Sequence, residues 1–132
     1  MALSADRVTA CKSRGRFITL KMKASTTIYK GGMVSVDSSG LAIPAADTAS
    51  TIVIGIAEEY VVSAASGNYY VKVSKGVFKL ANSGSTAVVQ ATVGSNCVVE
   101  DDQTVGINTA QDIVAGKVDE IDADGGIWVA FL

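Results

Sequence analysis

Short segments in which apolar and polar residues alternate recur about every ten residues along this chain, separated by glycine, serine, asparagine and aspartate. In residues 16–23, for example, Ile18, Leu20 and Met22 fall on one face and polar or charged residues mostly on the other. A period of two is that of a β-strand with one buried face. Only residues 86–92 resemble a helical turn. The pattern predicts an all-β fold, either a small β-barrel or a β-sandwich.

The expected strands are residues 16–23, 26–29, 33–37, 41–43, 51–62, 69–74, 77–80, 96–100, 104–106, 113–121 and 127–132. The long apolar segment 51–62 is expected at the centre of a sheet, and Gly55 within it indicates a bulge or a close approach of two backbones. Turn residues after positions 100 and 121 predict that each of the last two pairs of strands forms a hairpin.

The chain has room for one domain, and we expect an extended N-terminal arm, residues 1–15, followed by a β-rich body, residues 16–132. Hydrophobic residues make up 48% of the sequence, but only 6% are aromatic, so the core is expected to be thin. Self-association would enlarge such a core. We place the oligomer interface on apolar strands, at Ile54, Ile56, Trp128 and Phe131.

Positive charge is concentrated at the start of the chain. Residues 1–30 hold seven basic residues and one acidic residue, a net charge of +6, whereas residues 31–132 hold four basic and twelve acidic residues, a net charge of −8. The seven basic residues are Arg7, Lys12, Arg14, Arg16, Lys21, Lys23 and Lys30. Such an asymmetry indicates attraction to an acidic partner, which could be nucleic acid, a membrane or a protein surface.

Protein is the favoured partner of this basic segment. A single-stranded nucleic-acid binder would use aromatic side chains beside the cations, and only Phe17 and Tyr29 are interleaved with them here, in a chain whose pI is about 4.9. Residues 1–15 show no amphipathic helical stripe, and no apolar run is long enough to span a bilayer or to form a signal peptide. A small, polar arm of this kind orders on a partner's surface; a frayed terminus without a role is the alternative.

The residues argue against catalysis. The chain has no histidine, which excludes serine–histidine and cysteine–histidine mechanisms. A Ser–Lys pair, the carboxylates of Glu58 and Glu59, or a Cys97 nucleophile would remain, but adjacent strand residues point to opposite faces. No phosphate-binding glycine loop occurs. We therefore expect no enzyme and no cofactor, and we expect Cys11 and Cys97 to be reduced thiols, Cys97 buried in a strand.

Two acidic stretches are weak candidates for a metal site. Glu120, Asp122 and Asp124 resemble the start of a calcium-binding loop, but the position of its final glutamate falls on Phe131. The acidic residues 100–102 stand at an expected hairpin tip, where they could hold a cation if symmetry gathered several copies. Protection of the tip against aggregation is the favoured explanation, and no metal site is predicted.

Several strings of residues occur together and in order. They are Met1-Ala-Leu-Ser-Ala-Asp-Arg7, Lys30-Gly-Gly-Met-Val34, Gly40 with Pro44, Ile54-Gly-Ile-Ala-Glu58, Lys75-Gly-Val-Phe78, Ala81-Asn82, Val93-Gly94 with Cys97, Asp101-Asp-Gln-Thr-Val105, Ala115-Gly116 with Val118, and Gly126-Ile-Trp-Val129. With these strings the whole chain resembles the small capsid cement, or decoration, proteins of tailed bacteriophages.

The resemblance implies a structural protein that binds the outside of a matured capsid, commonly as a trimer, and reinforces the seams between major capsid subunits. It implies neither catalysis nor a cofactor, and it implies a virion location after synthesis in the host cytoplasm. With the charge of the arm, it leads us to expect docking through Leu3, Arg7, Lys12, Arg14 and Arg16. A single-stranded nucleic-acid-binding β-barrel that uses Arg14, Arg16, Lys21, Phe17 and Tyr29 is the alternative.

Overall fold

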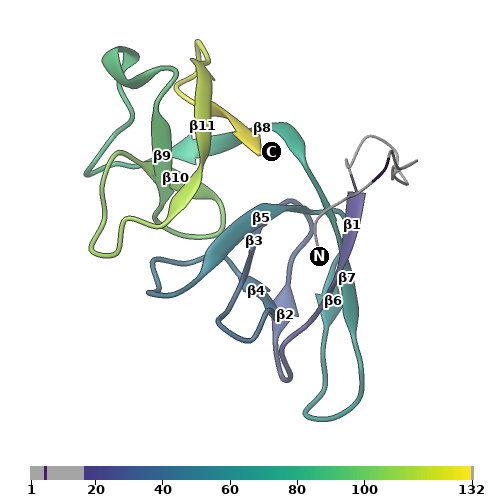
Figure 1. Ribbon diagram of the computed structural model, residues 1–132. Helices are drawn as coiled ribbons and strands as arrows, with labels where there is room; N and C mark the ends of the chain where they lie inside the picture. Colours follow the sequence, from purple (N-terminus) through teal and green to yellow (C-terminus); the bar gives the residue numbers. More distant parts are fainter. Residues whose placement is uncertain (1–4, 6–16, 132) are drawn as a thin grey trace.

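The computed structural model describes residue 5 and residues 17–131 (Figure 1). Its strands are β1 (Phe17–Lys21), β2 (Thr27–Ile28), β3 (Met33–Val36), β4 (Ala42–Pro44), β5 (Ile52–Ala57), β6 (Val61–Val62), β7 (Tyr70–Ser74), β8 (Gly76–Asn82), β9 (Asn96–Val99), β10 (Thr104–Gly106), β11 (Val114–Ile121) and β12 (Ile127–Phe131). The expected all-β fold is confirmed, and within residues 86–92 a short 3-10 turn, η2, covers Gln90–Thr92. The predicted docking residues Leu3, Arg7, Lys12, Arg14 and Arg16 lie outside the described residues.

The first half of the body, residues 17–74, is called the sheet lobe. Its five-stranded antiparallel sheet has the order β1-β7-β5-β3-β4, and the small β2–β6 pair lies beside it. A bridge between Met22 and Ala42 links the end of β1 to the far edge strand, so the sheet curls back on itself at that end. The enclosed core includes Ile28, Val71 and Val73, which are at most 1% exposed.

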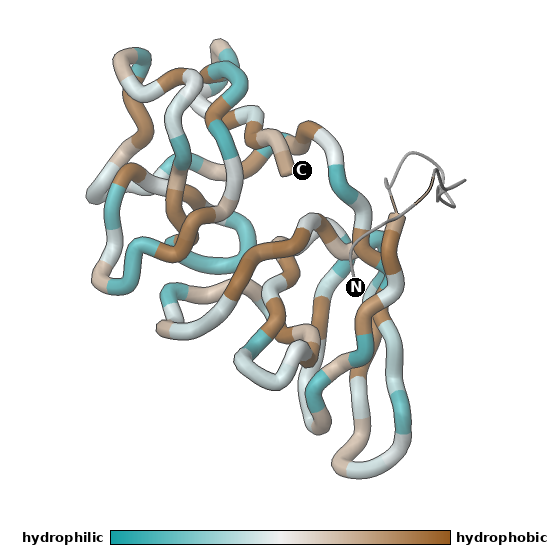
Figure 2. The backbone as a smooth tube through the Cα atoms, in the orientation of Figure 1, coloured by the Kyte–Doolittle hydropathy of each residue, from teal (hydrophilic) through white to brown (hydrophobic). Residues whose placement is uncertain are grey.

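The second half, residues 76–131, is the barrel lobe. Five strands close in the order β10-β8-β12-β11-β9, with β10 and β8 parallel and the other pairs antiparallel. Valines from alternate positions fill its centre, and the rings of Phe78 and Phe131 meet at 6.2 Å. Hydrophobic residues follow the strands in Figure 2, whereas many connecting loops are hydrophilic. The β9–β10 and β11–β12 hairpins are those predicted from the turn residues.

Strand β5 lies at the centre of the sheet, as expected, but it is shorter than expected. Val34 and Ser35 on β3 pair with Gly55 and Val53, so Ile54 is an extra residue and forms a bulge. A Cβ atom on Gly55 would stand 2.3 Å from the carbonyl oxygen of Ser74, which confirms the close backbone approach. The expectation of one strand over residues 51–62 is wrong, because β5 ends at Ala57 and β6 pairs instead with β2.

The two lobes share one core. Met33, Ala45 and Ile56 of the sheet lobe pack into the hydrophobic cluster of the barrel. A loop contact adds to this packing, since the carboxylate of Asp47 accepts hydrogen bonds from the Thr109 hydroxyl at 2.9 Å and from the amides of residues 110 and 111 at 3.2 and 3.0 Å. The backbone amide of Met33 also donates to the carbonyl of Asp102 at 2.7 Å.

Candidate docking surfaces

The outer face of the β1–β7 ladder carries two lysines, Lys21 of β1 and Lys72 of β7. Thr19 lies opposite Lys72, and Lys21 lies opposite Tyr70, so these four side chains share one face with Phe17. The Lys72 ammonium lies 4.7 Å from the centre of the Phe17 ring, and Tyr70 is 52% exposed. This set of five residues, here called the β1–β7 face, is the first candidate docking surface.

The register explains why this face is open. One row of paired residues crosses the sheet. Ile56 of β5 pairs with Met33 of β3 on one side and with Ser74 of β7 on the other. Ser74 in turn pairs with Phe17 of β1. The first three are no more than 5% exposed, because the barrel lobe covers this part of the sheet. Further along β1 and β7 the same side of the sheet is uncovered. The lysines of the β1–β7 face therefore stand on sheet surface that the barrel does not reach.

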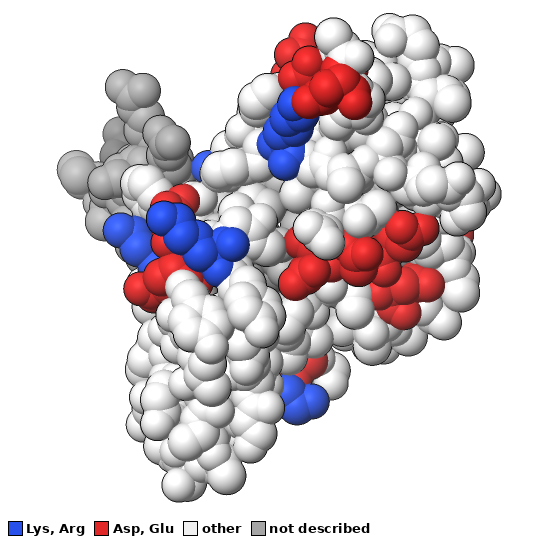
Figure 3. Space-filling model, turned by 180° about the vertical axis from the view of Figure 1, so that it is seen from behind, with Lys and Arg blue, Asp and Glu red and all other residues white. Residues whose placement is uncertain are grey.

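Acidic groups border the basic ones. Glu59 accepts a hydrogen bond from the backbone amide of Lys72 at 3.1 Å, and the amide of Glu58 donates to the Lys72 carbonyl at 2.9 Å. Figure 3 shows lysine side chains gathered with acidic ones in one region and a separate, purely acidic region beside it. The described surface thus offers both a mixed-charge region and an acidic region to a partner.

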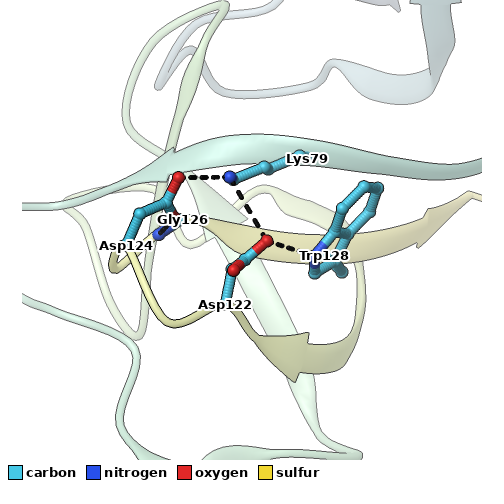
Figure 4. A network of polar contacts seen from close by, with 5 residues as sticks. All are labelled: Lys79, Asp122, Asp124, Gly126 and Trp128. Atoms are coloured by element: carbon cyan, nitrogen blue, oxygen red, sulfur yellow. Dashed lines mark hydrogen bonds and ion pairs between the residues drawn. The ribbon is translucent and has the colours of Figure 1, made fainter.

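The acidic turn between β11 and β12 holds a lysine. Asp122 and Asp124 both contact the Lys79 ammonium of β8, and Asp122 also accepts a hydrogen bond from the Trp128 indole at 3.0 Å (Figure 4). The bond from Trp128, followed by that from Lys79, lowers the pKa of Asp122, and the bond from Lys79 lowers that of Asp124. The bond to Asp124 in turn raises the pKa of Lys79. The network ties the hairpin to its neighbouring strand.

The residues considered for catalysis are separated. Cys97 is fully buried in the barrel, as expected, and burial raises the pKa of its thiol to about 11. Glu58 and Glu59 stand on the bend after β5, where Glu59 is exposed. Within the described residues, no group of three histidine, cysteine or carboxylate side chains is placed to hold a metal ion. The side chain of Glu100 accepts a hydrogen bond from the Ser83 hydroxyl at 2.7 Å.

The residues predicted for the oligomer interface lie in different environments. Ile56 and Phe131 are 5% and 3% exposed and pack in the core of their own chain, so they offer a partner little side-chain surface. Ile54 and Trp128 are half-buried. The bulge at Ile54 interrupts the two-residue alternation of β5, and Ile52 is 66% exposed.

Ile52 borders a groove that the sequence did not indicate. The groove has a volume of about 310 Å³. It lies between the start of β5 on one side and the start of β11 and the end of β12 on the other. Its walls include Ile52 and Val114, which are 66% and 47% exposed, together with Ile54 and Ala130. We call it the β5 groove. It is the second candidate docking surface.

The two aromatic residues proposed for nucleic-acid binding have different partners. Phe17 lies beneath Lys72 on the β1–β7 face, whereas the ring of Tyr29 lies 5.4 Å from that of Tyr60. Tyr70 is the aromatic residue that shares a face with Phe17 and Lys21. Sequence reasoning missed it because Tyr70 is far from the basic segment in the chain and meets it only through the β1–β7 pairing.

Comparisons of this chain with protein families, with curated proteins and with solved structures find no match. Among the described residues there is no helix with the length and apolar character needed to cross a membrane.

Proposed function

We propose that this chain is a structural virion protein that binds the outer surface of a tailed-phage capsid and stabilises the assembled shell by bridging major capsid subunits. The observation that carries the proposal is the resemblance to capsid cement proteins, which extends in order from Met1 to Val129. In this role the protein is not an enzyme and needs no cofactor. It is made in the host cytoplasm and acts on the capsid exterior.

The geometry of β1 supports docking through the arm. β1 begins at Phe17, directly after the basic arm, and forms the edge of its sheet. Apart from the bridge at Met22, the outer edge of residues 18–21 of β1 has no partner strand within residues 17–131. Such an edge can pair with an extended segment of another protein, and lysines on it disfavour pairing with the wrong partner. The edge of β1 and the β1–β7 face, with Lys21 and Lys72, form the described part of this docking surface, and the basic arm directly precedes them in the sequence.

Binding of this kind stabilises a shell by mass action. A protein that binds assembled subunits better than free ones shifts the equilibrium towards the assembled state by RT ln(1 + [L]/Kd). In a homotrimer three arms act together, so the second and third contacts form at the high effective concentration set by the first. Individually weak arm contacts then suffice for stable decoration.

The proposal is tested by removing residues 2–15 and measuring co-sedimentation with expanded, DNA-free capsids. We expect the shortened chain to fold and to bind at least about tenfold more weakly, and we expect binding of the full chain to weaken as salt is raised. Lys21→Gln and Lys72→Gln should each weaken binding, whereas Lys79→Gln, which removes a barrel-lobe lysine already paired with Asp122 and Asp124, should leave it unchanged. Equal binding by the full and shortened chains would exclude the arm as the docking element.

One observation favours the second candidate, a single-stranded nucleic-acid binder. The β1–β7 face places Phe17 and Tyr70 beside Lys21 and Lys72 on an open antiparallel sheet, and bases stack on aromatic side chains in such arrangements. Fluorescence anisotropy with a labelled oligonucleotide decides this point. Affinity that falls steeply with salt would support the candidate, and absence of binding at low salt would eliminate it.

A further inference from the structure

Two exposed tyrosines lie side by side next to the small β2–β6 pair. In the register of this pair, Ile28 lies opposite Val61. One residue further, the same register places Tyr29 opposite Tyr60, and the two rings lie 5.4 Å apart with their planes tilted by 34°. Ile28 is buried in the core, so by alternation its neighbour Tyr29 points outward. The tyrosines are 61% and 59% exposed, and paired aromatic rings left in water to this extent are typical of a binding surface.

A pocket of about 310 Å³ opens beside Tyr29, where the two lobes meet. Its walls are the connection from β2 to β3 and the turn from β9 to β10. The lining residues are Tyr29, Lys30, Gly31, Gly32, Asp102 and Gln103. A backbone hydrogen bond holds the two walls together, since the amide of Met33 donates to the carbonyl of Asp102 at 2.7 Å. The pocket is therefore formed before any ligand binds, as is usual for small-molecule sites.

Three polar side chains of this pocket have no partner within residues 17–131. The Lys30 ammonium, the Asp102 carboxylate and the Gln103 side-chain amide make neither an ion pair nor a hydrogen bond there. A carboxylate only accepts hydrogen bonds, an ammonium only donates them, and an amide does both. A ligand that satisfies all three needs groups that can both donate and accept, and hydroxyl groups do so.

Charge and hydrogen bonding narrow the class of ligand. Residues 100–102 are all acidic and Lys30 is the one cation among the lining residues, so a phosphate-bearing chain is disfavoured. A proline-rich peptide packs on aromatic rings, but proline has no backbone N–H to donate to the Asp102 carboxylate. A neutral sugar packs the C–H groups of one ring face on the negative face of an aromatic ring and offers hydroxyl groups to polar neighbours. It fits both the rings and the pocket.

We propose that the pocket and the rings of Tyr29 and Tyr60 form a binding site for a neutral saccharide, here called the sugar site. One sugar ring stacks on the tyrosines, and its hydroxyl groups bind the Asp102 carboxylate and the Gln103 amide. Gly32 keeps the pocket open, because a Cβ atom there would stand 3.4 Å from a carboxylate oxygen of Asp102 and 3.3 Å from the Tyr29 carbonyl oxygen. The inference does not depend on capsid docking, which uses the β1–β7 face.

The test is saturation-transfer NMR on the full chain with four disaccharide probes: maltose, cellobiose, lactose and chitobiose. Because the site is open and half-exposed, we expect at least one probe to bind with a dissociation constant of about 1–10 mM. Transfer should be strongest at the C–H protons of one sugar ring, which lies against the tyrosines. Absence of transfer to all four probes would overturn the proposal.

Matched variants test the assigned contacts. Tyr60→Ala and Asp102→Asn should each weaken binding of that probe at least about fivefold. Tyr70→Ala, at a tyrosine 52% exposed on the β1–β7 face, and Asp119→Asn, at an exposed carboxylate outside the pocket, should leave it unchanged. Unchanged binding in either variant of the sugar site would contradict the proposal. Decaproline is the counter-probe, and transfer to it but to no disaccharide would assign the rings to a proline-rich peptide and overturn the proposal.

Discussion

At the scale of single residues, Gly55 fixes how closely β5 and β7 approach. A Cβ atom at this position would stand 2.3 Å from the Ser74 carbonyl oxygen, a backbone atom that cannot move aside alone. Gly55→Ala should therefore lower the free energy of unfolding by about 1–3 kcal/mol in urea denaturation. Gly84→Ala is the control, since a Cβ atom there would have no neighbour within 4 Å and the variant should lose no stability. Equal stabilities would show that the backbones separate easily.

The contacts of Lys79 make stability depend on pH in acid. The pKa of Asp122 and that of Asp124 are lowered below the usual 3.8 in the folded chain, so their contribution is present above about pH 4 and is lost as pH falls through the folded values. In Asp124→Asn the melting temperature should fall less between pH 5 and pH 2.5 than in the parent chain. Asp119→Asn is the control, because Asp119 is exposed and its side chain makes no ion pair or hydrogen bond with the described residues. An unchanged pH profile in Asp124→Asn would contradict this role.

Cys97 should be chemically silent in the folded protein. Its side chain is fully buried and the pKa of its thiol is raised to about 11, so the reactive thiolate is scarce at pH 8. In a Cys11→Ser variant, which leaves one thiol, labelling by a disulfide reagent should proceed only at the rate of unfolding. Rapid labelling under native conditions would mean that the barrel opens locally beside β9.

At the scale of elements, local pairings follow from the sequence and distant ones do not. The hairpins β9–β10 and β11–β12 are indicated by the turn residues between them, and the bulge in β5 by Gly55. The parallel pairing of β8 with β10 closes the barrel. No tight turn connects these two strands, so the sequence does not indicate that they pair. The split of residues 51–62 into β5 and β6 was likewise hidden, because both parts are apolar and β6 is defined by its distant partner β2.

Asp47 joins two loops that are more than 60 residues apart. Its carboxylate accepts three hydrogen bonds from residues 109–111, and a carboxylate with several donors is costly to lose. Asp47→Ala should lower the free energy of unfolding by about 1–3 kcal/mol and speed amide exchange at residues 110 and 111. Asp37→Ala removes a carboxylate that bonds only within its own turn, at residues 39 and 41, and should leave exchange at 110 and 111 unchanged. Unaltered exchange in Asp47→Ala would show that packing alone holds the loops.

At the scale of the whole molecule, the candidate surfaces could be predicted only in part. The basic segment was visible in the sequence, and the structure adds Tyr70 and Lys72 to it through the pairing of β7 with β1. The β5 groove could not be predicted, since it depends on where β7 leaves the sheet and on how the barrel packs against it. Ile56 and Phe131 were predicted at an oligomer interface, but they are buried in the core of their own chain. An apolar strand residue can be buried in either way, and the sequence does not distinguish the two.

The charge distribution along the sequence separates a basic start from an acidic body. Residues 31–132 carry a net charge of −8, and acidic side chains form a region of their own beside the mixed one in Figure 3. In the proposed docking, a basic arm would be attracted to an acidic surface and the acidic body would be repelled from it. This asymmetry orients the docking proposed for the capsid surface.

The most direct test of the proposed capsid docking is quantitative co-sedimentation of the full chain with the heads of a tailed phage. The account predicts saturable binding to expanded, DNA-free heads at a fixed number of copies per capsid, little binding to free capsid subunits, and an increase in the temperature at which decorated heads disrupt. Absence of saturable binding, or equal binding to free subunits and expanded heads, would contradict it.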